Sequence, residues 1–151
     1  MTTMLGSCIA ACLHDKHAHV GGMNHFLLPA GDDKDGATLR YGAYAMELLV
    51  NGLLSIGARR ERLVAKLFGG GLMSQGLEDI GATNAAFAEK YLQREHIPLI
   101  GGSTGGHQAR RIQFWPTSGR ARQLAIAAPP DDVLRPPAAG LAKNSGSVEF
   151  F

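Results

Sequence analysis

Two apolar runs near the start of the sequence predict a pair of neighbouring β-strands. Residues 2–13 contain a glycine turn followed by an apolar run rich in small residues, and a second apolar run, 21–29, ends at a proline. The stretch 15–19 between them is polar and is typical of a hairpin loop. Two neighbouring strands would place Cys8 and His25 side by side, although the two residues are far apart along the chain.

The spacing of apolar residues further along the chain predicts two helices. Apolar residues recur at helical spacing over 39–54, with Thr38 as the expected N-cap and Gly57 as the expected stop. Asn84 is expected to cap a second helix, which ends before Pro98 because a proline disfavours helical backbone in the residue before it. The buried face of this second helix would be formed by Phe87, Tyr91 and Leu92.

Short apolar or alternating segments predict the remaining strands, and a change in composition marks a tail. The expected strands are 63–68, 98–100, 111–115 and 120–126, with a hairpin turn at 117–119. Four of the seven prolines lie within 128–147, which we interpret as a mobile segment with an apolar end at 148–151 that could dock on the domain. The expected organisation is a domain at 1–127 and a Pro-rich C-terminal tail at 128–151.

Composition indicates one globular domain in a reducing compartment. The 151 residues are 45% hydrophobic and 19% charged, with apolar runs too short for a membrane span and no visible signal peptide. The two cysteines, Cys8 and Cys12, would lie roughly 13 Å apart on a strand, too far for a disulfide. We therefore expect a cytoplasmic protein. A net charge of +2 is too small to indicate a nucleic-acid partner.

A cysteine beside a histidine is the smallest nucleophile–base pair. The thiolate is the attacking species, so His25 must either hold Cys8 deprotonated or take its proton. The backbone N–H groups near Gly6 and Ser7 would lie close to the thiol, as an oxyanion site requires. The competing interpretation is a cysteine that simply packs in the core, which is the usual role of this residue type.

Other polar groups admit alternative interpretations. Thr2 or Thr3 could orient the imidazole or the substrate amide through a hydroxyl hydrogen bond. The cysteines and histidines lack the paired spacing of zinc sites, so no metal is expected. The glycine runs 69–71 and 101–106 lack a phosphate-binding fingerprint and indicate tight turns. The arginines are most simply solvated, and the minority interpretation is steering toward an acidic partner: Arg59, Arg60, Arg62, Arg110, Arg111, Arg120 and Arg122.

Two motifs carry a resemblance to a known family. The run LGSCIAACLHD at 5–15, followed by GGMNHFLLP at 21–29, closely resembles the CheD family of chemoreceptor glutamine deamidases. Further runs agree with this family and extend the resemblance over nearly the whole chain: 66–71, 80–84, 105–106 with 110–112, and 146–151.

The resemblance implies a fold, an activity and a set of site residues. The fold would be α/β, a layered sandwich of mixed β-sheet with two main helices, similar to the catalytic domain of the cytotoxic necrotising factor toxins. The activity would be hydrolysis of specific glutamines of methyl-accepting chemotaxis receptors to glutamate and ammonia. The family's catalytic cysteine, histidine and threonine fall on Cys8, His25 and Thr2. Family members usually carry additional residues, including a strand, before this block, so Thr2 lies at the end of the present chain.

The expected mechanism is covalent, through a thioester on Cys8, with no metal or organic cofactor. The expected partners are the cytoplasmic helices of chemoreceptors and, as in some bacteria of this family, a CheC-type phosphatase. Arg110, Arg111 and the 101–106 loop are expected to contact the receptor outside the pocket. The rival hypothesis is a non-catalytic adaptor that binds chemoreceptors or the phosphatase without turnover.

Overall fold

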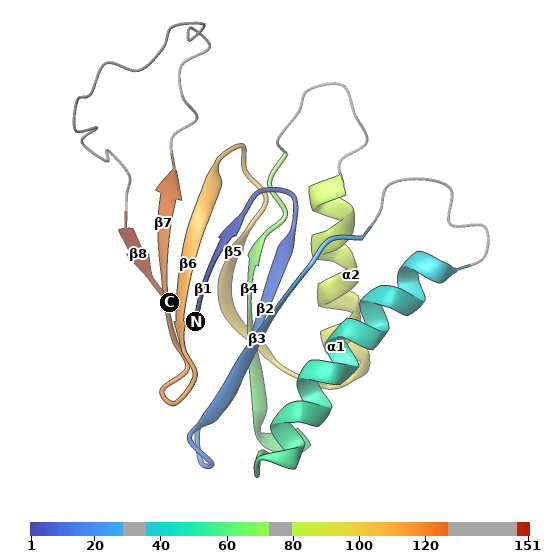
Figure 1. Ribbon diagram of the computed structural model, residues 1–151, viewed down its shortest axis with the longest axis vertical. Coiled ribbons are helices and arrows are strands. Elements are labelled where there is room, and N and C mark those ends of the chain that lie inside the picture. Colours follow the sequence, from blue (N-terminus) through green and yellow to red (C-terminus); the bar gives the residue numbers. More distant parts are fainter. Residues whose placement is uncertain (29–35, 73–79, 127–147) are drawn as a thin grey trace, which may run out of the picture.

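Two four-stranded sheets and two helices form three layers in the computed structural model, which describes residues 1–28, 36–72, 80–126 and 148–151 (Figure 1). Sheet A is antiparallel, in the order β1 (Thr2–Leu5), β6 (Ala109–Trp115), β7 (Arg120–Ile126), β8 (Val148–Phe150). Sheet B has the order β3 (Val20–Phe26), β2 (Ile9–Asp15), β4 (Leu63–Gly69), β5 (Leu99–Thr104), and only its β4–β5 pair is parallel. The predicted α/β layered fold with a mixed sheet is confirmed.

Strand β2 is the centre of the molecule, because both of its faces are buried. One face packs on the helices through Ile9, Ala11 and Leu13. The other face, with Ala10 and Cys12, packs on sheet A. Successive side chains of a strand point to opposite sides, so an almost continuous apolar run is what a strand between two layers requires.

The helices cover the face of sheet B that is turned away from sheet A (Figure 1). Helix α1 (Ala37–Ser55) buries Met46, Val50 and Leu53, and helix α2 (Ile80–Arg94) buries Ala88, Tyr91 and Leu92 against the same core. A short 3-10 turn, η1 (Arg60–Arg62), precedes β4. Within the described residues, neither helix is long and apolar enough to cross a membrane.

Most predicted elements are confirmed, but the predicted helix starts are wrong. Thr38 lies inside α1, which follows Gly36, a residue with a φ of 65°. Asn84 lies inside α2, where its side chain binds other parts of the fold. Strand β5 is longer than predicted, since part of the 101–106 glycine run is strand, and the turn is confined to Gly105 and Gly106.

The predicted tail is described only at its end. Residues 128–147 lie outside the described residues, so the expectation for that segment stays a prediction. Strand β8 pairs with β7, and the ring of Phe151 meets Phe68 edge-on, with ring centroids 5.3 Å apart. The prediction that the apolar end docks on the domain is therefore confirmed.

Candidate active site

The candidate nucleophile lies on the bend where the chain crosses from sheet A to sheet B. Residues Gly6 to Cys8 connect β1 to β2, and the glycine run after β4 holds this bend by its backbone. The N–H of Gly71 donates to the carbonyl of Gly6 and the N–H of Gly70 to that of Cys8, both at 2.8 Å. A Cβ at Gly69, whose φ is +109°, would lie 2.0 Å from the Cys8 carbonyl oxygen. Only glycine therefore permits this approach.

A buried asparagine ties the same bend to two other segments. The amide nitrogen of Asn84 donates to the Ser7 carbonyl at 3.2 Å and to the Ile80 carbonyl at 2.8 Å. Its amide oxygen accepts from the N–H of Leu28 at 2.7 Å, just beyond the end of β3. Because Asn84 is fully buried, these contacts place the bend, β3 and α2 relative to one another. Sequence analysis missed this role.

The candidate base lies on the neighbouring strand, on the same face as the nucleophile. His25 is opposite Ala10 in the β2–β3 ladder, and residues directly opposite share a face of the sheet. Cys8 precedes Ala10 by two positions and so belongs to that face, which is turned toward sheet A. Cys8 and His25 thus belong to the same face, with Cys8 on the bend one residue before the β2–β3 ladder begins.

A threonine from the other sheet holds the imidazole. The hydroxyl Oγ1 of Thr3 lies 2.9 Å from Nδ1 of His25. If Nδ1 carries the proton and donates it to this hydroxyl, Nε2 is left as the acceptor, which is the atom a general base uses. Among the described residues, Nε2 of His25 has no hydrogen-bond partner.

Of the two threonines that sequence analysis left open, Thr3 makes the hydrogen bond to the imidazole. Thr2 is exposed and pairs with Gln113 on β6. Because side chains alternate along β1, Thr2 belongs to the outer face of sheet A and Thr3 to the inner face. The role that the family resemblance gives to Thr2 stays a prediction.

Burial distinguishes the two thiols. Cys8 is half-buried, and this burial raises the pKa of its thiol, an effect that its own backbone N–H partly offsets. Cys12 is buried inside β2, and burial raises the pKa of its thiol to about 12 despite the nearby charge of Lys66. In the free protein Cys8 is therefore protonated at neutral pH, and a base must take its proton as the sulfur attacks.

The bend also carries the N–H groups predicted to bind an oxyanion. In the part of the chain that the structure describes, the N–H of Ser7 has no hydrogen-bond acceptor and that of Cys8 has only its own sulfur, whereas the carbonyls of Gly6, Ser7 and Cys8 are all bonded. Donors without a protein partner beside a nucleophile have the character of an oxyanion site.

Other candidate sites have structural roles. No group of three His, Cys, Asp or Glu side chains within the described residues is arranged to hold a metal ion. Arg110 is 5% exposed, and its guanidinium binds the carbonyls of Ser103 and Gly105. Arg110 therefore presents little surface to a partner, while Arg111 is exposed, and their contact with a receptor stays a prediction.

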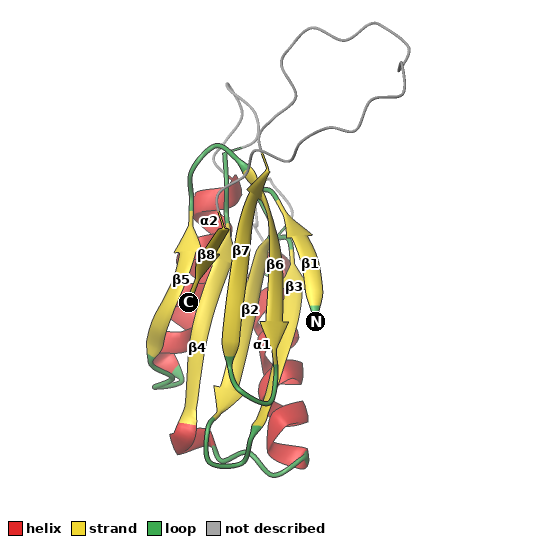
Figure 2. Cartoon of the chain, turned by 90° about the vertical axis from the view of Figure 1, so that its left-hand side faces the viewer, coloured by secondary structure: helices red, strands yellow, loops and turns green. Residues whose placement is uncertain are grey.

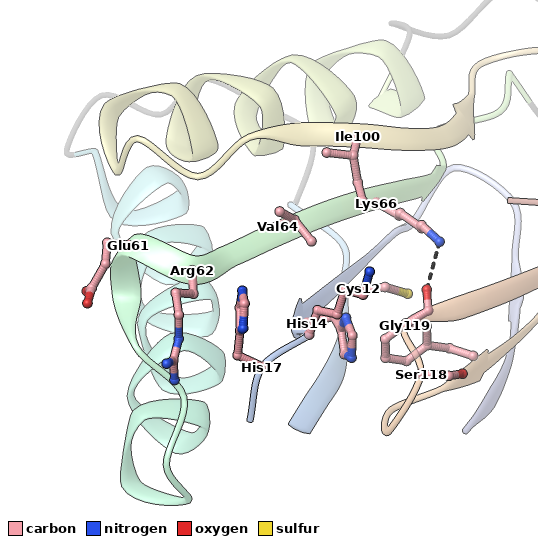
Figure 3. Close-up of a pocket in the computed structure, with 12 residues that line it drawn as sticks. Cys12, His14, His17, Glu61, Arg62, Val64, Lys66, Ile100, Ser118 and Gly119 are labelled. Atoms are coloured by element: carbon pink, nitrogen blue, oxygen red, sulfur yellow. Dashed lines mark hydrogen bonds between the residues drawn. The ribbon is translucent and has the colours of Figure 1, made fainter. Parts of the chain in front are cut away.

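A cavity of about 570 Å³ lies between the sheets, toward the end of β2 that is remote from Cys8 (Figure 3). Two of the polar side chains that line it are engaged within the fold. Lys66 Nζ donates to the carbonyls of Gly119 and Phe151 at 2.7 and 2.8 Å, and His14 Nε2 lies 3.3 Å from the Thr117 carbonyl. The cavity is therefore separate from the bend, β3 and β1 that form the candidate active site.

Comparison with known proteins shows which family the chain belongs to. The family described as "CheD chemotactic sensory transduction" matches residues 27–124. A protein of Caulobacter sp. (strain K31) named probable chemoreceptor glutamine deamidase CheD is 61% identical, covering 100% of this chain and 83% of that protein. Proteins of the same name from Caulobacter vibrioides (strain NA1000 / CB15N) and Acidiphilium cryptum (strain JF-5) are 58% and 57% identical, covering 100% of this chain and 83% and 84% of their own lengths. The chain belongs to the CheD family.

Proposed function

We propose that this protein is a glutamine deamidase that converts selected glutamine side chains of methyl-accepting chemotaxis receptors to glutamate and releases ammonia. The names of its relatives supply the reaction and the class of substrate. The observation that carries the proposal is the hydrogen bond between Thr3 and the imidazole of His25, on a strand that lies beside the bend carrying Cys8. This is the nucleophile, base and orienting group that covalent amide hydrolysis uses.

In the first half of the reaction, Cys8 attacks the glutamine side-chain carbonyl carbon. A carbon–sulfur bond forms while Nε2 of His25 takes the thiol proton, as the raised pKa of Cys8 requires. The carbonyl oxygen becomes an oxyanion, which the N–H groups of Ser7 and Cys8 receive. The carbon–nitrogen bond then breaks, and the imidazolium gives its proton to the nitrogen, which leaves as ammonia.

In the second half, water hydrolyses the thioester. His25 takes a proton from the water while its oxygen attacks the acyl carbon, and the same N–H groups hold the second oxyanion. The carbon–sulfur bond breaks, the proton returns to the sulfur of Cys8, and the new glutamate side chain is released. The sum is glutamine plus water giving glutamate plus ammonia, which requires no metal or organic cofactor.

The exposure of the site favours a glutamine displayed on a protein surface. His25 is exposed and Cys8 is half-buried, so the reacting atoms lie close to the surface of the molecule. A site of this depth gives a free amino acid few contacts, whereas a folded substrate adds contacts around it that position the amide. The cytoplasmic helices of a chemoreceptor fit this requirement, and we propose that the protein acts in the cytoplasm. A CheC-type phosphatase is a further proposed partner.

The competing proposal is an adaptor that binds receptors without turnover. A protonated resting thiol is compatible with an adaptor as well as with an enzyme, so the raised pKa of Cys8 does not separate the two. The Thr3 contact favours the enzyme, because an adaptor has no need to orient the imidazole. Turnover itself decides between the two proposals.

The test is incubation with a cytoplasmic receptor fragment, followed by ammonia release and by the small mass gain of each modified glutamine. Cys8→Ala should lose about 10⁴-fold or more in rate, as expected for a lost nucleophile. His25→Asn should lose about 10²-fold or more, the scale of a general base. Cys12→Ala is the matched control and should keep its activity. Receptor binding without any conversion by the unmodified protein would support the adaptor instead.

A further inference from the structure

The outer face of sheet A is turned toward the viewer in Figure 2, and no described helix or strand covers it. Along β6 and β7 the buried and exposed positions alternate, so one set of side chains faces the core and the other faces outward. The outward set includes three exposed arginines, Arg111, Arg120 and Arg122. Met4, 56% exposed, and Trp115, 37% exposed, lie on the same face.

The three arginines form a stripe across two strands. Arg120 and Arg122 are two positions apart on β7, about 7 Å along a strand. Arg122 pairs with Gln113, two positions from Arg111 on β6, so Arg111 and Arg122 are diagonal neighbours. The outward positions of β1, β6 and β7 contain no acidic residue. Like charges this close repel one another, and an anionic partner would relieve the repulsion.

We propose that this outer face docks an acidic surface of the protein substrate. The proposal rests on the proposed function and adds a second contact region to it. Arginine, tryptophan and methionine are enriched in protein–protein interfaces, and lysine and acidic residues are depleted there. The outward positions of β1, β6 and β7 match this composition, since their charged residues are arginines only. A stripe of three charges on a chain with a net charge of +2 favours a protein over the far denser charge of nucleic acid.

Strand β1 connects the face to the candidate active site. Its residue Met4 points outward beside Arg111, its partner in the ladder, while Thr3 points inward to His25. A substrate whose glutamine reaches the site between β1 and β3 can therefore also contact the arginine stripe, which lies on the next two strands of the same sheet. Contacts that bind the ground state and the transition state equally lower KM and leave kcat unchanged, and we expect this of the arginine stripe because it lies outside the reacting site.

Trp115 offers a direct readout, because it is the one tryptophan of the sequence and lies on the proposed docking face. The probe is poly-L-glutamate, titrated at low ionic strength while the fluorescence of Trp115 is recorded. The expected result is a saturable change that weakens as salt is added, since salt screens exposed charges. The variant Arg111→Gln/Arg120→Gln/Arg122→Gln should lose it. The matched control Arg59→Gln/Lys90→Gln/Arg94→Gln removes the same charge from exposed positions elsewhere and should retain it.

Deamidation kinetics on a folded receptor fragment provide the second measurement. The stripe variant should raise KM about 3- to 30-fold at low salt with kcat unchanged, and the control variant should match the unmodified protein. Equal alkylation rates of Cys8 would show that both variants are folded around an intact site.

A Trp115 response without deamidation would overturn the proposed function and leave the docking face standing. Deamidation with no Trp115 response, or with no difference between the variants, would overturn the docking face. A stronger Trp115 response to phosphatidylserine vesicles or duplex DNA than to poly-L-glutamate would also overturn it.

Discussion

Replacing Asn84 with alanine tests whether α2 positions the bend that carries the nucleophile. The change leaves the buried N–H of Leu28 without its acceptor and the carbonyl of Ser7 without its donor. An unpaired buried group costs about 1–3 kcal/mol, and the Ser7 carbonyl, being only partly buried, recovers some of this from water. The expected loss in the free energy of unfolding is therefore about 2–4 kcal/mol. Domains of this size are stable by about 5–15 kcal/mol, so the variant should still fold.

The consequence for catalysis follows from what the bend carries. Without its tie to Asn84, Ser7 can shift, and the N–H groups proposed to bind the oxyanion shift with it. Misplacing a reacting group by about an ångström can cost up to about 10²-fold in rate, so kcat should fall about 10- to 10²-fold. KM for a folded receptor fragment should change little, because the surface that binds the receptor is untouched.

The assay pairs urea unfolding, followed by tryptophan fluorescence, with steady-state kinetics well below the unfolding midpoint. Asp15→Asn is the matched control, since Asp15 is equally buried at the opposite end of β2 and stabilises the fold through several hydrogen bonds. That variant should lose stability and keep its kcat. If Asn84→Ala lost stability but kept kcat within about twofold, the positioning role would be refuted and Asn84 would serve the fold alone.

Three further predictions use contrasts between neighbouring groups. Iodoacetamide should label Cys8 in the folded protein, and the labelling rate should increase as pH rises toward the raised pKa of the Cys8 thiol. Cys12 should be labelled only after unfolding. Labelling of both thiols in the native state would contradict the burial argument. Thr3→Val should lower kcat about 3- to 10-fold through loss of the hydrogen bond to the imidazole, and Thr2→Val should leave kcat unchanged. A larger loss in Thr2→Val would favour the catalytic role that the family resemblance gives to Thr2. Burial acts to raise the pKa of Asp15, but hydrogen bonds from backbone N–H groups and an arginine outweigh it and hold the pKa well below its ordinary value. The stability that Asp15 provides is therefore fully present above about pH 4 and is lost as pH falls. In urea melts, Asp15→Asn should flatten the decrease in the free energy of unfolding between about pH 4 and pH 2. An unchanged decrease would show that other carboxyl groups dominate it.

The elements with strong periodicity were predictable because their pattern is local. Strands β4, β6 and β7 and both helices follow from spacing, and so does the β2–β3 hairpin, which pairs His25 with Ala10. The division into two sheets was not predictable in this way. Residues 2–13 contain a glycine turn and then an apolar run, yet the part before the turn pairs with β6, a segment more than a hundred positions away. No local pattern encodes the pairing of β1 with β6, and this pairing is the reason that the chain crosses between the sheets at the bend.

The helix starts show how a tertiary contact overrides a local signal. An asparagine ahead of an apolar pattern is a common N-cap, and Asn84 was assigned to that role. Its side chain instead points into the fold, on the same stripe as Ala88, Tyr91 and Leu92. The sequence did carry a signal for this role, since Asn84 is a polar residue at helical spacing from a buried apolar stripe. A buried amide must find hydrogen-bond partners, so this spacing predicts contacts within the fold. The partners themselves, on the bend and at the end of β3, required the structure.

The position of the proposed nucleophile also explains why, of two similar cysteines, Cys8 is the better suited to chemistry. Cys12 lies within β2, where layers on both sides exclude water and raise the pKa of its thiol to about 12. Cys8 lies four positions earlier, where the chain has left sheet A and not yet joined the ladder of sheet B, so one side of its thiol remains accessible. The edge strands β1 and β3 end on this same side and supply Thr3 and His25. A bend between two sheets thus offers what a central strand cannot, namely a fixed backbone and a thiol that a substrate can reach.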